Sequence, residues 1–427
     1  MYANEDQLVR WLSSIPELPS SHNPVHILDN EDEDASHTGS SSFLVLEQSM
    51  AVENNDTPRA NRFLSKQTQE LGGLVADGGH NSPTLASSAS NRSAWVSNGS
   101  IPVSNRSSPS KQFRSAEMQD AGFKVGNFRV DQHPESLKEL RLQLRDIGSG
   151  HRILPASLQT ELWDSESEIP AYAFDTDEAT RATTKALATN LPSLSWVQGL
   201  VSRANECHAD RECEASWNAD VHSPILEQVF RSDRFSSRDL VDFRFCPSAQ
   251  ILPWSKPRDA PSKMVDFCIF IRPKLDSPEE RAINSICQLR PGLSINHTDL
   301  GNFCKHPIAL SIETKRPAEH GDKATLQMGT WHSSQWRSLR YNRNCSSPQS
   351  IEFLPGVIVQ GHDWQFVATI LDESGKARLL RTVRLGGTES ELTVYSLVMA
   401  LQRLRRWIKE VYWPAFVSDM LKDSLPG

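Results

Sequence analysis

Hydrophobic residues are scarce in this sequence: they make up 38% of its 427 residues, and mean hydropathy is -0.47. Because this is low for a globular protein, we expect part of the chain to be disordered. No hydrophobic run reaches membrane-spanning length, and the first residues lack the basic and hydrophobic segments of a signal peptide. We therefore expect an intracellular protein, nuclear or cytoplasmic, that is not secreted and not embedded in a membrane.

An excess of basic residues is also missing. The chain has 45 Lys and Arg against 53 Asp and Glu, a net charge of -8. Non-specific affinity for nucleic acid comes from neutralising phosphates with Lys and Arg, so this balance excludes a protein that coats DNA or RNA over its whole surface. It leaves a local binding site possible.

Disulfide and zinc frameworks are not indicated either. Seven cysteines are scattered along the chain, at 207, 213, 246, 268, 287, 304 and 345. This spacing fits reduced thiols better than a disulfide framework, and it lacks the paired ligands of a zinc site. No zinc finger or helix-turn-helix that would read a base sequence is recognisable.

The N-terminal third has little periodic hydrophobic pattern. Residues 81–110 contain eleven Ser and four Asn, half of that window. Such a composition cannot bury enough apolar surface to offset the entropy of ordering the chain. We expect residues 1–130 to be largely disordered, with one short helix near 5–13, and residues 131–427 to form one domain.

Helical and strand patterns alternate in the rest of the chain, which predicts an α/β domain. Pro414 should break or kink the last helix. Helices are expected at 134–142, 177–188, 193–207, 212–231, 277–288, 321–343 and 391–421, and strands at 240–246, 264–271, 307–315, 357–360, 365–371 and 378–384.

Two of the predicted strands carry charge in hydrophobic surroundings. Glu313 and Lys315 end the strand over 307–315, where a period of two places them on one face. Asp266 is the one acid in the strand over 264–271, a costly position unless something compensates it. Two carboxylates on neighbouring strands can bind Mg²⁺ or Mn²⁺, and a nearby lysine can offset phosphate charge. The Glu-x-Lys tripeptide alone also arises often by chance.

A third acid precedes these strands, on the helix predicted over 212–231. Glu214, Trp217, Asn218, Val221 and His222 fall at helical spacing and share one face. Glu214 is then placed to complete a metal site, with His222 beside it. The alternative is a helix whose hydrophobic residues are core while Glu214 faces water.

Together these motifs resemble the PD-(D/E)XK nuclease superfamily, and more closely the nuclease-like domain of uncharacterised fungal proteins. Val265 stands where the superfamily name has proline. The resemblance covers about residues 130–420. It rests on Glu214–Asn218, Val221-His222, Val265-Asp266, Glu313–Pro317, Gln327–Trp331 and Gln335-Trp336.

The resemblance implies a restriction-endonuclease-like core, in the order α-β-β-β-α-β, with added helices. It implies a Mg²⁺- or Mn²⁺-dependent nuclease that hydrolyses phosphodiester bonds of nucleic acid, with DNA expected before RNA. Asp266, Glu313 and the carbonyl of Thr314 would bind the metal, Lys315 would activate water, and Glu214 would complete the site. The other class of function is a nuclease-like fold with little catalysis that binds nucleic acid or protein as a regulatory module; protein partners are not indicated.

Substrate contacts are expected on the helix that follows the Glu-x-Lys strand. Gln327 can bond a nucleic-acid backbone, Trp331 can stack on a base, and His222 can assist from the preceding helix. Core packing is the competing explanation for Trp331. Residues 303–345 hold seven Lys or Arg and three acids, which predicts a locally positive neighbourhood around Lys315.

Overall fold

The computed structural model describes residues 108–164, 169–175, 191–231, 239–258, 265–317, 319, 321–342 and 349–425. All of these belong to one compact unit, Asn98–Gly427. The expected helices near 5–13 and over 177–188, and the expected disorder up to residue 107, lie outside the described residues.

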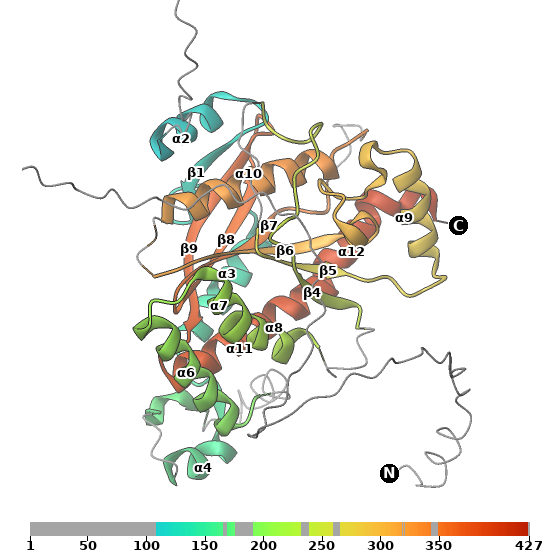
Figure 1. The fold of residues 1–427 in the computed structure, drawn as a ribbon. Helices are drawn as coiled ribbons and strands as arrows, with labels where there is room; N and C mark the ends of the chain where they lie inside the picture. Colours follow the sequence, from blue (N-terminus) through green and yellow to red (C-terminus); the bar gives the residue numbers. More distant parts are fainter. Residues whose placement is uncertain are drawn as a thin grey trace, which may run out of the picture. The chain divides into compact units, whose positions relative to one another are not determined.

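A mixed seven-stranded sheet forms the centre of the fold, in the order β1-β9-β8-β7-β6-β5-β4 (Figure 1). Strand β1 is parallel to β9, and β6 is parallel to β7, whereas the other neighbours are antiparallel. The strands are β1 (Phe123–Asn127), β4 (Val241–Phe245), β5 (Phe267–Ile271), β6 (Ile308–Lys315), β7 (Leu354–Gln360), β8 (Asp363–Leu371) and β9 (Ala377–Gly387).

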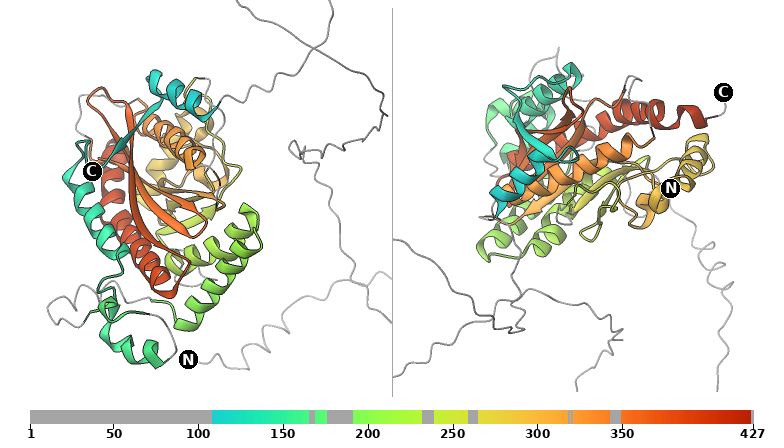
Figure 2. Two further views of the ribbon diagram at one scale, coloured as in Figure 1. Left: turned by 90° about the vertical axis from the view of Figure 1, so that its left-hand side faces the viewer. Right: turned by 90° about the horizontal axis from the view of Figure 1, so that it is seen from above.

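Helices cover both faces of this sheet. In the left view of Figure 2, α10 lies on one side of the strands, and α11 and α3 lie on the other. Helix α2 packs on α10, and α8 packs on α11. The main helices are α2 (Pro109–Met118), α3 (Glu135–Gly148), α4 (Gln159–Asp164), α6 (Leu194–Ala209), α7 (Glu214–Trp217), α8 (Ser223–Phe230), α9 (Pro278–Gln288), α10 (Gly321–Leu339), α11 (Glu391–Trp407) and α12 (Trp413–Phe416).

Two adjacent strands, β5 and β6, are buried along their whole length. Every residue of β5 and of β6 is buried. A strand covered on both faces reads as a continuous apolar run rather than as an alternation, which is the pattern of Ile308–Leu310 and of β5. The apolar residues of β6 pack against both covering layers, and this packing also buries the polar residues at the end of the strand.

The expected α/β class and the order α-β-β-β-α-β are confirmed by α8, β4, β5, β6, α10 and β7, with α9 inserted between β5 and β6. Ordered elements also precede residue 131, because α2 packs on α10 and β1 joins the sheet beside β9. Short pieces β2 (Leu154–Pro155) and β3 (Phe174–Asp175) form a separate two-stranded sheet. Among the described residues, no helix combines the length and the apolar character needed to cross a membrane.

Two long helices differ from the predicted regular form. The helix expected over 212–231 is α7 and α8 joined by a π-helical turn, Asn218–His222. The last helix winds from α to π at Ile408–Tyr412, directly before α12, and Pro414 lies in the first turn of α12. A wider turn tolerates the missing proline N–H, so the chain stays helical where a break was expected.

Helix α10 runs back along the sheet from the end of β6 to the start of β7. Because β6 and β7 are parallel, this crossover carries the basic end of α10 away from Lys315. Nineteen residues span about 28 Å at 1.5 Å per residue. Arg337 and Arg340 therefore lie at the far end, and the positive neighbourhood expected around Lys315 is wrong.

Candidate active site

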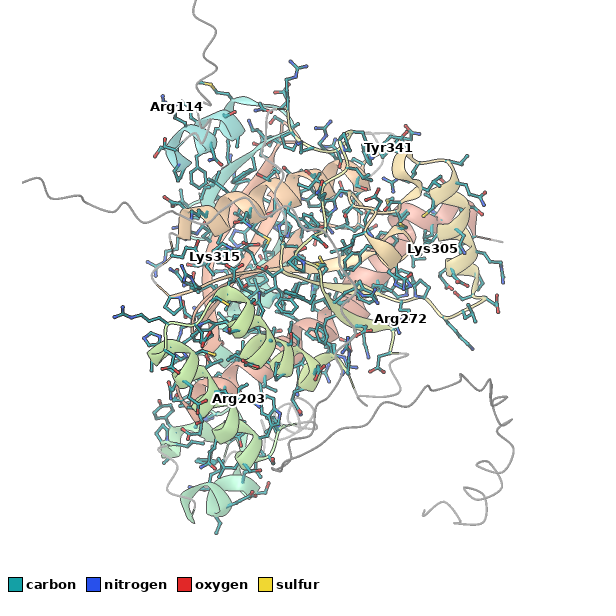
Figure 3. The ribbon with its side chains drawn as sticks, in the orientation of Figure 1. Arg114, Arg203, Arg272, Lys305, Lys315 and Tyr341 are labelled. Atoms are coloured by element: carbon teal, nitrogen blue, oxygen red, sulfur yellow. The ribbon has the colours of Figure 1, made fainter. Side chains whose placement is uncertain are left out.

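Lys315 ends β6 with its ammonium among three oxygens. Its Nζ lies 2.6 Å from Oε1 of Glu313, 3.2 Å from Oε2 of Glu214 and 2.6 Å from the carbonyl oxygen of Thr314. Figure 3 labels Lys315 at this end of β6, with Lys305 at the other. Glu313 is 0% exposed and Lys315 is 7% exposed. The sheet thus encloses an acid and a base whose charges depend on each other.

Asp266 lies on the neighbouring strand segment, one residue before β5. Its backbone N–H donates to the carbonyl of Ile312 at 3.0 Å, so it follows the ladder of β6 although β5 begins at Phe267. Its Oδ2 accepts from the backbone N–H of Thr314 at 2.8 Å, and Oγ1 of Thr314 is 2.9 Å away. Thr314, which alternates along β6 with Glu313 and Lys315, therefore holds the Asp266 carboxylate in place.

The first turn of α7 supplies Glu214. Its side chain is one-third exposed and contacts Lys315. The π-helical turn that follows carries Asn218, whose Oδ1 lies 2.9 Å from Oγ1 of Thr314 and 2.9 Å from Nδ1 of His222. Because an amide oxygen can only accept, both neighbours donate to it in this arrangement. Asn218 links the helix that carries Glu214 to the strand that carries Lys315.

We call Glu214, Asp266, Glu313 and Lys315 the carboxylate centre. Burial raises the pKa of Glu313 well above its usual range, and the negative charge of Asp266 raises it further. Burial and Asp266 likewise raise the pKa of Glu214, and burial raises the pKa of Asp266 against the Thr314 hydrogen bonds. Burial opposes the charge of Lys315, yet the Glu313 and Glu214 carboxylates raise its pKa above the ordinary value. Three acids share one cation, which leaves an excess of negative charge.

The donor set fits a hard divalent cation. Both carboxylate oxygens of Glu313 are buried; Oε1 lies 2.6 Å from Nζ of Lys315, and Oε2 has no hydrogen-bond partner among the described residues. Carboxylate and carbonyl oxygens are the ligands that Mg²⁺ and Mn²⁺ prefer. Within the described ranges, no three or more His, Cys, Asp or Glu side chains are already arranged around one metal position. The available donors are two carboxylates, a third acid at the rim and the Thr314 carbonyl, where Lys315 now lies.

Trp331 and His222, both expected to contact substrate, are core residues. Trp331 is 0% exposed, and its indole N–H donates to Oγ of Ser311 at 2.9 Å. His222 is fully buried between Trp217 and Trp364, with ring centroids 5.8 and 5.4 Å away. Burial lowers the pKa of His222 to about 3, so its imidazole is neutral. Neither ring has a free face for a base, because β6 and β8 pack against them.

Gln327 lies in the first half of α10 and is half-buried. Its role in substrate binding stays a prediction. Asn218, by contrast, has a place that sequence reasoning missed. Its position on the face of Glu214 was visible, but its partner Thr314 is 96 positions away, and no local pattern indicates that hydrogen bond.

One comparison with known proteins identifies the family of this chain. Residues 159–413, more than half of the chain, match the PD-(D/E)XK nuclease superfamily. Searches of curated proteins and of solved structures gave no match. The matched range contains α6 to α11 and all four members of the carboxylate centre. This chain belongs to the PD-(D/E)XK nuclease superfamily.

Proposed function

We propose that this protein is a metal-dependent nuclease that hydrolyses phosphodiester bonds of DNA at the carboxylate centre. One observation supports this most strongly. Glu313 is a fully buried carboxylate whose Oε2 has no hydrogen-bond donor among the described residues, and Asp266 and Glu214 add more negative charge than the one ammonium of Lys315 balances. A buried cluster of that kind is unfavourable unless a cation compensates it. DNA is proposed as the substrate because of the superfamily.

The proposed ligands are the side chains of Asp266 and Glu313 and the carbonyl oxygen of Thr314, with Glu214 at the rim. A divalent ion held there supplies Lewis acidity and a more acidic bound water. The protein residues do the positioning. The Thr314 N–H orients Asp266, and the β6 backbone fixes Glu313 and the Thr314 carbonyl relative to each other. Asn218 holds the Thr314 side chain from the opposite helix.

Lys315 is the proposed catalytic cation. The Glu313 and Glu214 carboxylates keep it protonated, so in this state it donates hydrogen bonds and does not accept a proton. A divalent ion held by these carboxylates would compensate the same charges. The Lys315 ammonium would then be placed to orient water or to stabilise the charge that develops on phosphate.

The test is a cleavage assay on the full chain. Single- and double-stranded DNA and RNA are incubated with wild type and with Lys315→Ala and Asp266→Asn, in Mg²⁺, Mn²⁺ or EDTA. Wild type should cut DNA only with metal. Lys315→Ala should lose at least about a hundredfold in rate, the usual scale for one electrostatic group, with a smaller loss of DNA affinity. Asp266→Asn should lose metal-dependent turnover, because an amide is a weaker, neutral ligand.

Lys274→Ala is the matched control. Lys274 is exposed and follows the end of β5 that points away from Asp266, so this variant should cut at the wild-type rate. Wild type that binds DNA but cuts no substrate with either metal would falsify the enzyme assignment and would favour the binding module. Cleavage confined to RNA would replace the proposed substrate.

A further inference from the structure

A second concentration of charge, of opposite sign, lies beside β9. A pocket of about 450 Å³ is formed by the end of β1, the last turns of α3 and the second half of β9. No Asp or Glu is among its lining residues. Five of them are arginines, Arg129, Arg141, Arg145, Arg381 and Arg384, and we call this site the arginine pocket.

Close packing brings these elements together. Gly148 ends α3 against the backbone of β9, where a Cβ atom would lie 2.1 Å from the carbonyl oxygen of Arg384. A larger residue would push the helix off the strand. Asn127, at the end of β1, pairs with Arg381 on β9. The chain after β1, helix α3 and the distant strand β9 therefore contribute arginines to one wall.

Two of the five arginines have acidic partners. Arg145 pairs with the exposed Asp146, and Arg384 pairs with Asp363 and Glu389. The last turn of α3 also attracts a cation such as Arg145, because helix C-termini carry partial negative charge. These local interactions account for Arg145 and Arg384 without any ligand.

The other three arginines form no ion pair with any described acid. Arg129 is exposed and Arg381 is half-buried. Arg141 lies over the ring of Phe128, with its guanidinium carbon 5.5 Å from the ring centroid, and its buried Nε has no hydrogen-bond partner. Five rigid N–H donors per guanidinium make arginine well suited to phosphate. Three uncompensated guanidinium groups form a site for more than one phosphate oxygen.

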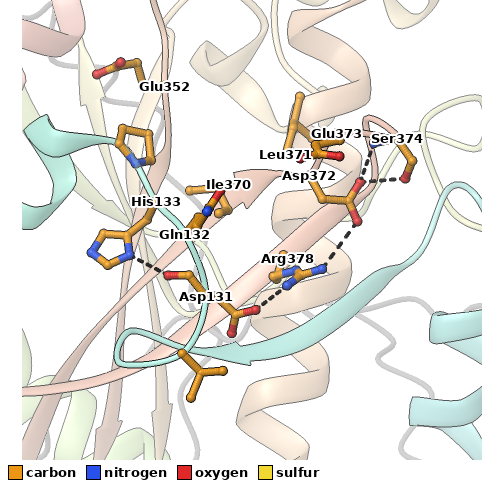
Figure 4. A pocket seen from close by; sticks show the side chains of 12 residues that line it. Asp131, Gln132, His133, Glu352, Ile370, Leu371, Asp372, Glu373, Ser374 and Arg378 are labelled. Carbon is orange, nitrogen blue, oxygen red and sulfur yellow. Dashed lines mark hydrogen bonds and ion pairs between the residues drawn. The ribbon is translucent and has the colours of Figure 1, made fainter.

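Another pocket on the same strand contains an arginine whose charge is neutralised by acids. A pocket of about 730 Å³ is lined by Asp131, Asp372 and Arg378, among others (Figure 4). Arg378 pairs with both acids, and Asp372 accepts hydrogen bonds from Ser374. Arg381, three residues further along β9, has no such partner among the described acids.

The arginine pocket and the carboxylate centre lie along the same edge of the sheet. Lys315 pairs with Gln360, Gln360 with Asp363, and Asp363 with Gly387, so three strand spacings separate Lys315 from the end of β9. At about 4.8 Å each, they cover about 14 Å, and Arg381 is six residues back along β9, about 20 Å at 3.3 Å per residue. The separation is thus roughly 25 Å, which corresponds to about seven nucleotides at 3.4 Å each.

We propose that the arginine pocket binds backbone phosphates of the nucleic-acid substrate about seven nucleotides from the bond that is cut. This inference rests on the proposed nuclease function and adds a substrate-binding site to it. The pocket gives an acidic protein the local positive charge that phosphate binding requires. Arginines that bind backbone phosphates contact no base edge. The pocket therefore contributes to affinity and to the position of the strand in the site, but not to sequence preference.

The experiment measures binding of single-stranded DNA from 4 to 20 nucleotides to the full chain in EDTA, where metal-dependent cleavage cannot occur. Wild-type affinity should step up once the strand is long enough to reach the pocket. The double variant Arg129→Ala/Arg381→Ala should lose that step, with affinity for the 4-mer unchanged. Its slope of log affinity against log salt for the 20-mer should fall by about 1.4, or 0.7 for each phosphate contact.

The control is Arg114→Ala/Arg203→Ala, which removes the same charge from exposed positions on α2 and α6 (Figure 3). It should keep both the step and the slope. Loss of affinity that is equal in both double variants, or equal for the 4-mer and the 20-mer, would overturn the proposal in favour of general charge. So would an affinity for heparin or anionic vesicles that depends on these arginines while DNA binding does not. Because no turnover is measured, failed cleavage and failed binding remain distinguishable.

Discussion

The carboxylate centre and the arginine pocket differ in where their charges lie. Glu313, Asp266 and Lys315 are buried, so each controls the protonation of the others. The arginines line an open pocket, with Arg129 and Arg145 exposed to water and salt. Buried charges interact strongly and respond to protons and metal ions, whereas exposed ones are screened. The first region should therefore be governed by pH and metal, and the second by ionic strength.

The largest effect is expected from Glu313→Gln, which removes the central buried charge. Cleavage should fall a hundredfold to a thousandfold, the scale for a group that stabilises transition-state charge. In EDTA at pH 7 the variant should unfold at a temperature no lower than wild type, because a neutral amide costs less to bury. Addition of Mg²⁺ should raise the melting temperature of wild type and not of the variant. Equal Mg²⁺-induced shifts in both proteins would remove Glu313 from the metal site.

The pH dependence of metal affinity further distinguishes the carboxylate centre from the arginine pocket. The pKa values of Glu214, Asp266 and Glu313 are raised by burial, so the folded protein binds protons more tightly than the unfolded chain does. Their protonated forms stabilise the fold, and this contribution is lost as pH rises through the raised values. Metal binding must displace these protons. Affinity should rise up to about tenfold per pH unit between pH 5 and 7 for each proton released, as measured by calorimetry.

DNA binding through the arginine pocket should follow the opposite pattern, with a strong salt dependence and little change over that pH range. A pH-independent metal affinity would show that the acids are ionised before the metal arrives. The burial argument for the carboxylate centre would then be wrong.

A smaller effect is expected from Asn218→Ala, which touches neither substrate nor metal in the proposed arrangement. The substitution removes the acceptor of the buried Nδ1 of His222, and it leaves the hydroxyl of Thr314 with Asp266 as its remaining acceptor. Activity should fall about tenfold, the low end for a residue that orients a ligand. Loss of a buried hydrogen bond should cost about 1–3 kcal/mol of unfolding free energy. If Asn218→Ala needs more Mg²⁺ for cleavage than wild type does, and Asn218→Asp restores the wild-type requirement, Asn218 positions the metal ligands.

Asn302→Ala provides the control for that experiment, because Asn302 is exposed in the turn before β6. It should melt and cut as wild type does. If Asn218→Ala lowers the melting temperature but leaves the rate and the Mg²⁺ requirement unchanged, Asn218 is structural only.

The central strands and their charged residues could be predicted from sequence because local signals agree there. Apolar runs identify β5 and β6, and the costly acids in them indicate a site. Trp331 and the basic end of α10 could not be placed, because their positions depend on how the helix crosses the sheet. The arginine pocket was invisible for a similar reason. Its arginines lie between residues 129 and 384, and only the folded structure shows that they line one pocket.

The π-helical turn Asn218–His222 lets one extra residue enter the helix without turning its two ends relative to each other. A π turn holds one residue more than the α-helical turn it replaces. Deletion of Ala219 would let this turn close as a regular α-helical turn, and Glu214 would keep its direction relative to α8. The residues that move are those of the turn itself, so the deletion should break the contact of Asn218 with Thr314 while Glu214 stays beside Lys315.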